Sequence, residues 1–139
     1  MNVKRTLSET KIDVKLKLAM LWTSFMFFYA YVDFFHLYMP ETVANILKGK
    51  VFVFDISAVF LMIAMLFVAI PVLMIFLSVV LPAKANRWTN MITAIVFIPY
   101  MLFNLAGEAW MHMYFAAAVE VAQLCFIFYF ALKWPRVEE

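Results

Sequence analysis

Four side chains in this sequence could do chemistry together, and they come in two pairs. Asp33 and His36 are three residues apart, and Glu108 and His112 are four residues apart. Both spacings place the two side chains of a pair on one face of a helix. A carboxylate with an imidazole can bind a divalent metal or exchange protons near neutral pH. If the two helices are neighbours, all four groups converge on one pocket.

A fifth ionisable residue, Glu120, stands inside an apolar run that we interpret as a membrane span over residues 109–133. A carboxyl group near the middle of a span costs about 2.5 kcal/mol or more unless it is protonated or paired. Gln123, Asn104 and Tyr29 are the candidate partners. The alanines at 116–118 take little volume and leave room either for a cavity above Glu120 or for close helix packing.

The composition indicates which elements must position these groups. Hydrophobic residues make up 68% of the 139 residues and charged residues 14%, against about 25% charged in ordinary soluble domains. The apolar runs are continuous, which favours helices over the alternating strands of a membrane barrel. We therefore predict an all-α integral membrane four-helix bundle in a single domain. Its spans are expected over residues 18–38, 52–81, 88–106 and 109–133.

Prolines and basic residues predict the connections. The basic segment 1–17 is expected to lie at the membrane surface, and residues 40–49 to form a short interfacial helix that begins at Pro40 and ends before Gly49. The second span is too long to cross about 30 Å upright, so we expect a tilt or a bend at Pro71. Pro99 is expected to kink the third span.

The distribution of basic residues predicts the orientation. Nine of the eleven Lys and Arg residues lie in the N-terminal segment, around residues 82–88, or at the C-terminus. By the positive-inside rule both termini are cytoplasmic, in a multi-pass protein of the bacterial inner membrane. The two carboxylate and histidine pairs then lie at the external end, and residues 40–49 are external.

Three functions fit this arrangement. The first is a pocket near the external side that binds a small lipophilic or cationic molecule, with aromatic walls and carboxylates that orient the ligand. The second is proton- or cation-coupled transport through the acidic and histidine residues. The third is a membrane-embedded enzyme, either metal-dependent or acting through acid–base chemistry. The predicted ligand-binding residues are Tyr29, Asp33, His36, Asn104, Glu108, Trp110, His112, Glu120 and Gln123.

A divalent metal held by Asp33, His36, Glu108 and His112 is one option within these functions. The Glu-x-x-His signature of di-metal bundles is absent from the two pairs. The residue types do not distinguish among iron, manganese and zinc as the metal. Other partners expected are the lipid bilayer, a small-molecule or lipid ligand and a second copy of the chain. Phosphate-binding glycine loops are excluded because the chain has two glycines, and the basic residues form no nucleic-acid patch.

The stretches Tyr-Ala-Tyr-Val-Asp-Phe-Phe-His-Leu-Tyr-Met-Pro at 29–40 and Asn-Leu-Ala-Gly-Glu-Ala-Trp at 104–110 resemble small four-span bacterial membrane proteins of uncharacterised families. The overall layout is similar to the DoxX-like group. A looser likeness is to the EXPERA group of sterol-binding and isomerising proteins. That likeness implies a four-helix pocket; no motif of the group aligns residue by residue, so isomerase activity is not carried over.

Overall fold

The computed structural model describes residues 7, 9–107 and 110–135. This part of the chain is almost entirely helical, which confirms the predicted all-α class. Four long helices are joined by turns and by one larger connection that holds a short helix and a small hairpin. The elements in chain order are α1 (Val14–His36), α2 (Thr42–Leu47), β1 (Lys50–Val51), β2 (Phe54–Asp55), α3 (Ala58–Val80), α4 (Ala83–Phe103) and α5 (Met111–Leu132).

The helix starts follow local capping chemistry. Asp13 caps α1 by accepting a hydrogen bond from the backbone nitrogen of Lys15 at 2.8 Å. Ser57 caps α3 in the same way, through Phe60 N at 3.1 Å. The third long helix was predicted to begin at residue 88, but α4 begins at Ala83, directly after Pro82. Pro82 thus separates α3, which ends at Val80, from α4. The fixed φ of proline suits the residue directly before a helix, so the next helix starts at once.

The predicted second span, 52–81, is wrong in its first part. Residues 50–55 form an antiparallel hairpin in which Lys50 pairs with Asp55 and Val51 with Phe54, and α3 starts only at Ala58. The remaining 23 residues are about 35 Å long, which removes most of the excess length. The short helix is also smaller than predicted, because Pro40 lies in a turn and Glu41 takes a left-handed conformation with φ 67° before α2 begins.

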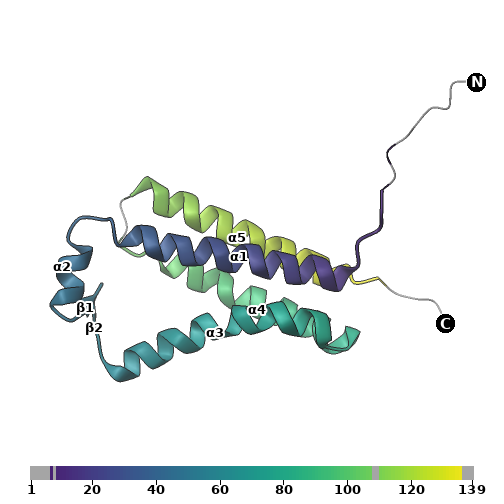
Figure 1. Ribbon diagram of the computed structural model, residues 1–139, viewed down its shortest axis with the longest axis horizontal. Coiled ribbons are helices and arrows are strands. Elements are labelled where there is room, and N and C mark those ends of the chain that lie inside the picture. The colour runs from purple at the N-terminus through teal and green to yellow at the C-terminus, as the bar shows by residue number, and fades with distance from the viewer. Residues whose placement is uncertain (1–6, 8, 108–109, 136–139) are drawn as a thin grey trace, which may run out of the picture.

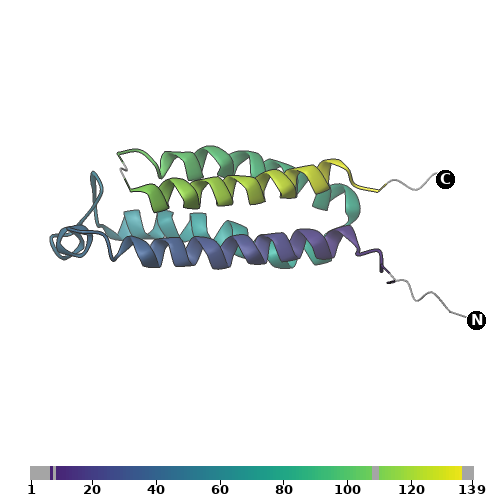
Figure 2. The same ribbon diagram turned by 90° about the horizontal axis from the view of Figure 1, so that it is seen from above.

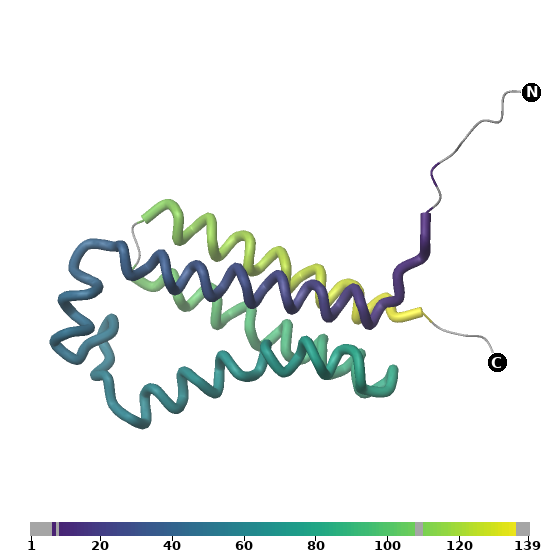
Figure 3. Tube along the Cα trace, viewed as in Figure 1, coloured from purple at the N-terminus to yellow at the C-terminus, as the bar shows by residue number. Residues whose placement is uncertain are grey.

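The four long helices run roughly antiparallel, so that α1 begins and α5 ends at the same end of the molecule (Figures 1 and 2). We call this the terminal end. The opposite end carries α2 and the hairpin. Toward that end α3 diverges from the other three helices, and it changes direction along its length (Figure 3). Pro71 lies inside α3, and a proline removes a backbone hydrogen bond and bends a helix.

Three of the helices, α1, α3 and α5, are long and apolar enough to cross a membrane. In α3 only 11% of the most apolar window is buried inside the protein. Such an exposed apolar surface would be costly in water but not in lipid. These features indicate a membrane protein. The fourth long helix, α4, is not among the three, and its first two turns contain Lys84, Asn86, Arg87 and Asn90.

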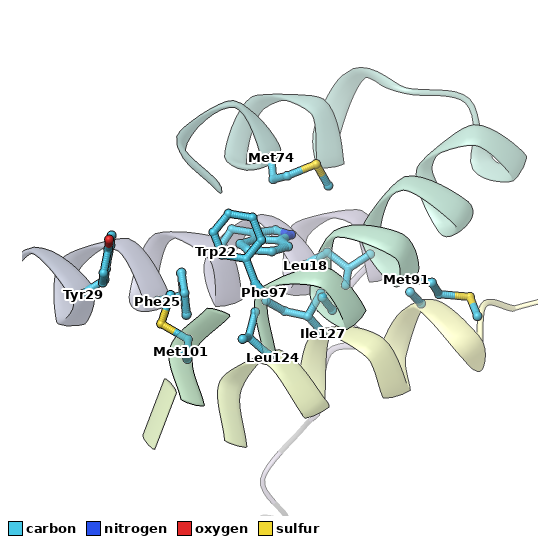
Figure 4. Packing of buried hydrophobic residues seen from close by; sticks show 12 residues of the cluster. Leu18, Trp22, Phe25, Tyr29, Met74, Met91, Phe97, Met101, Leu124 and Ile127 are labelled. Carbon is cyan, nitrogen blue, oxygen red and sulfur yellow. The ribbon is translucent and has the colours of Figure 1, made fainter. Parts of the chain in front are cut away.

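The core lies between the terminal end and the middle of the molecule (Figure 4). Trp22, Phe25, Phe97, Leu124 and Ile127 are at most 1% exposed. The rings of Trp22 and Phe25 meet edge to face with centroids 5.7 Å apart, and those of Phe25 and Phe97 do so at 6.4 Å. Large aromatic side chains from α1 and α4 and aliphatic ones from α5 thus close the interior of this half.

A buried polar network fixes α1, α3 and α4 to one another at the terminal end. Asn90 accepts hydrogen bonds from Trp22 Nε1 at 2.7 Å and from Ser78 Oγ at 3.2 Å. Its Nδ2 donates to the backbone oxygen and to Oδ1 of Asn86 at 2.9 and 2.7 Å. Asn86 Nδ2 donates to Ser78 O at 2.6 Å. All four side chains are fully buried, so both hydrogens of the Asn90 amide and its oxygen are satisfied without water.

Candidate functional site

A cavity of about 960 Å³ occupies the half of the molecule where α3 diverges. Residues of α1, α3, α4 and α5 form its sides, and α2 with the hairpin covers the end opposite the termini. Pockets that hold small molecules usually measure about 300–1,000 Å³. The space therefore suits a ligand of lipid or drug size.

Five of the nine predicted ligand-binding residues line this one cavity. Tyr29, Asp33 and His36 come from α1, Asn104 follows α4, and Glu120 comes from α5. They lie at different depths. Asp33, His36 and Asn104 are near the covered end, whereas Tyr29 and Glu120 are one or more helical turns closer to the core. Polar residues of α1, of α5 and of the end of α4 thus share the lining of the cavity.

Glu120 is the buried acid of this lining. Its side chain belongs to a residue that is 3% exposed, and Oε1 has no hydrogen-bond partner among the described residues. Two of the partners predicted for it have other contacts: Gln123 Nε2 donates to Ser24 Oγ at 2.8 Å, and the Tyr29 and Tyr100 hydroxyl oxygens are 3.3 Å apart. Most buried polar groups are paired, so the Glu120 oxygen requires a proton or a partner beyond the described residues.

The rest of the wall is aromatic and apolar. Phe67 of α3 stacks on Tyr100 of α4 with ring centroids 4.8 Å apart. Ala116 and Ala117, which are 5% and 4% exposed, line the cavity on the α5 side. Because these two positions carry only methyl groups, they leave the volume between Glu120 and the covered end open. Both alanines are therefore compatible with close helix packing as well as with the cavity that they line.

His112 and Trp110 lie elsewhere. They line a separate hollow of about 480 Å³ between α1 and α5, walled by aromatic side chains such as Phe35 and Tyr38. The Trp110 and His112 rings meet edge to face at 6.0 Å. Val32, Met39 and Ala116 border both spaces, so a thin layer of side chains separates His112 from the cavity that contains His36.

This separation bears on the predicted metal site. Within residues 7, 9–107 and 110–135, no three His, Cys, Asp or Glu side chains are grouped so that they could hold a metal ion. Asp33 and His36 line one space and His112 the other. Glu108, the fourth predicted ligand, lies outside the described residues. The described members of the set therefore do not form a centre by themselves.

Several residues at the site and below it were not predicted. Tyr100 and Phe67 form the aromatic wall, and Lys50 and Asp55 form an ion pair at the covered end, with Nζ and Oδ1 4.0 Å apart and both side chains largely exposed. Asn86 and Asn90 hold the opposite half together. The two asparagines are four residues apart, a spacing that places both on one helix face, and this was the available signal for them.

Comparison with known proteins gives a family and no activity. A family model described as a family of unknown function, DUF6326, matches residues 6–139. The chain belongs to this family. No curated protein and no solved structure matches it. The prediction of an uncharacterised family is confirmed at this level, and the likenesses to the DoxX-like and EXPERA groups stay predictions.

Proposed function

We propose that this chain is a four-span protein of the bacterial inner membrane that binds a small lipophilic or cationic molecule in the cavity between its helices. The observation that carries the proposal is Glu120, a buried carboxyl group with an unpaired oxygen in the wall of a cavity of about 960 Å³. An unpaired buried acid and an open volume both suit a ligand.

The four-span arrangement is part of this proposal. The 21 residues of α4 are about 32 Å long, and α4 packs along α5, which is apolar enough to cross. Four crossings return the chain to its starting side, as the shared terminal end requires. Lys15, Lys17, Arg87 and Lys133 lie near that end, and by the positive-inside rule they support our proposal that it faces the cytoplasm. The covered end of the cavity then faces outward.

The unpaired oxygen of Glu120 indicates which chemical groups a ligand needs. An unpaired polar group in a low-dielectric interior is costly, and a charged one more so. A ligand with an amine or hydroxyl group satisfies it by donating to Oε1, and Asp33 adds a second acid in the same cavity. The rings of Tyr29, Phe67 and Tyr100 offer faces to a cation or to an apolar body. A molecule with one polar head and an apolar remainder fits both requirements.

Proton- or cation-coupled transport is the alternative, supported by the presence of Asp33 and Glu120 in one cavity. A conducting path must also cross the other half of the molecule. One helical turn beyond the cavity floor, Phe25, Phe97 and Leu124 are 0–1% exposed and pack together. This dry layer favours binding over conduction. A membrane-embedded enzyme is the third candidate, and no observation favours it over binding.

A set of ligands that share a dodecyl chain and differ in their polar head group tests the proposal. The purified protein in lipid nanodiscs is titrated with dodecylamine, dodecanol or dodecanoate, and the thermal unfolding midpoint is measured. We expect the amine, and less strongly the alcohol, to raise the midpoint of the wild type, and Glu120→Leu to abolish the effect. Gln123→Ala, one turn away and outside the cavity lining, is the matched control. Equal shifts for all three heads, or an undiminished amine effect in Glu120→Leu, would refute the assignment.

A flux assay separates the alternative. Proteoliposomes loaded with a pH-sensitive dye are given a pH gradient, and the rate of proton entry is compared with that of empty liposomes. If the protein only binds a ligand, protons should enter its liposomes no faster than they enter empty liposomes. An excess that disappears in Glu120→Gln would instead establish transport through Glu120.

A further inference from the structure

The segment that covers the cavity is a self-contained unit. We define the lid as residues 42–55, which comprise α2, β1 and β2. The strands pair with each other, and Ile56 N donates to Gly49 O at 2.8 Å just beyond them. Lid residues from both α2 and the hairpin line the cavity, among them Ile46 and Val51. In Figure 1 the lid stands across the wide end of the space between α3 and the other helices.

The lid is attached to α3 on one side. The Phe54 ring of β2 stacks on the Phe60 ring of α3 with centroids 6.0 Å apart. Ser57, the capping residue of α3, follows the hairpin after one residue. The chain also joins the lid to the end of α1 through residues 37–41, where Thr42 N donates to Met39 O at 3.3 Å. A movement of the hairpin tip would therefore turn about these two attachments, which hold the lid to α1 and α3.

Away from these attachments, Phe52 of the lid meets Gly107, which follows α4. A Cβ atom placed on Gly107 would lie 3.0 Å from Cε2 and 3.4 Å from Cζ of Phe52. A side chain at position 107 would displace the ring by a few tenths of an ångström, and φ 81° at this position also favours glycine. Phe52 remains 61% exposed, so this contact covers only part of the ring and is small enough to break.

The backbone at the same residue is strained. Phe52 and Val53 form the two-residue turn of the hairpin, and Phe52 has φ 53°. Hairpin turns that need positive φ usually place Gly, Asn or Asp there. A bulky residue held in this region often marks a functional segment. Here the strained position is also the one whose side chain reaches Gly107.

We propose that the lid opens and closes over the cavity, and that Phe52 resting on Gly107 is the latch that keeps it closed. Opening releases the ring from Gly107 and lets Phe52 relax, while the Phe54–Phe60 contact keeps the lid tethered to α3. The latch controls access from the external aqueous side. This inference uses the cavity of the proposed function, but its test requires no knowledge of the ligand.

A cysteine placed in the cavity reports lid opening. In a Cys125→Ser background, Ala117→Cys adds one thiol at a buried position that lines the cavity and not the second hollow. The reagent is the membrane-impermeant cation methanethiosulfonate ethyltrimethylammonium, added outside intact spheroplasts so that only the external face of the protein meets it, and the protein is then purified. The rate of modification is measured by mass spectrometry.

Two latch variants and one control are compared. Phe52→Gly removes the ring, and Gly107→Ala pushes it away, so each is expected to speed modification about tenfold, the change that follows when an opening equilibrium loses about 1.4 kcal/mol. Val53→Gly changes the other turn residue, which is 72% exposed, and is expected to leave the rate within about twofold of the parent. An alanine at 107 also strains the backbone, because Gly107 has φ 81°. In Phe52→Gly this strain remains but no ring is left to displace, so adding Gly107→Ala should change the rate less than it does in the parent.

The possible results test the latch and the existence of the cavity independently. Equal rates in the parent and both latch variants would overturn the latch and leave the pocket standing. Faster hydrogen exchange at residues 48–55 in Phe52→Gly with an unchanged cysteine rate would show a lid that moves without gating, which also overturns the proposal. A thiol that reacts in no variant, even with the small permeant reagent N-ethylmaleimide, would contradict the cavity itself. Equal unfolding temperatures of all variants exclude general loosening as the cause of faster labelling.

Discussion

Replacing Asn90 by Ala should destabilise the protein more than any other single polar truncation at the terminal end. The change removes the partner of Trp22 Nε1 at 2.7 Å, of Asn86 Oδ1 at 2.7 Å and of Ser78 Oγ at 3.2 Å, all in fully buried residues. Hydrogen bonds inside membrane proteins contribute on average about 0.6 and at most about 1.7 kcal/mol each. Groups left unpaired add a further cost. We therefore expect a loss of about 2–4 kcal/mol in the free energy of unfolding.

Reversible unfolding in mixed micelles, followed by far-ultraviolet circular dichroism while the denaturing detergent fraction rises, measures this loss. Thr89→Ala is the matched control on the same helix. Its hydroxyl bonds only to Ala85 O within the helix, at 2.8 Å and in an exposed position, so it should cost less than about 0.5 kcal/mol. If Asn90→Ala unfolded at the same detergent fraction as Thr89→Ala, the network would not hold the three helices together.

Three further predictions concern the cavity half. Glu120→Leu should raise the free energy of unfolding by about 1–3 kcal/mol, because it removes a buried oxygen that has no partner; a loss of stability would mean that a protein group pairs with Glu120. Pro71→Ala should straighten α3 and shorten the distance between spin labels at Val59 and Leu102, measured by electron–electron double resonance; an unchanged distance would place the cause of the divergence outside the helix. Dialysis against a chelator should leave the unfolding temperature unchanged, since the described residues contain no three-ligand group; a clear drop would indicate that Glu108 completes a metal centre.

The sequence predicted the long helices well where apolar runs were uninterrupted. The run before Pro82 ends α3 at Val80, close to the predicted end, because a proline acts locally. The first helix begins at Val14 and not at the predicted residue 18, because Asp13 caps it. The hairpin was not predicted, because the sequence around it contains no local signal of a turn. Its turn residues, Phe52 and Val53, carry none of the usual turn signals, and the run around them reads as a continuation of the span. The ring of Phe52 lies against Gly107, which is 55 positions away in the chain, and local sequence does not predict such a contact.

The site was predicted in part. Periodicity along one helix correctly brought Tyr29, Asp33 and His36 to one face, and that face lines the cavity. Periodicity does not show how a helix is rotated against its neighbour, and α5 turns Glu120 into the cavity but His112 into the adjoining hollow. The divergence of α3 depends on packing among four helices. The volume of the cavity therefore could not be predicted from single sequence segments.

The central claim is that the cavity beside Glu120 holds a molecule, and native mass spectrometry of the protein released gently from membranes tests it most directly. Ala117→Trp fills the cavity from α5, and Ala118→Trp adds the same ring at an exposed neighbouring position as the control. We predict a bound species of one defined mass on the wild type and on Ala118→Trp that is absent from Ala117→Trp. A bare wild-type mass, or the same bound species on all three proteins, would contradict the claim.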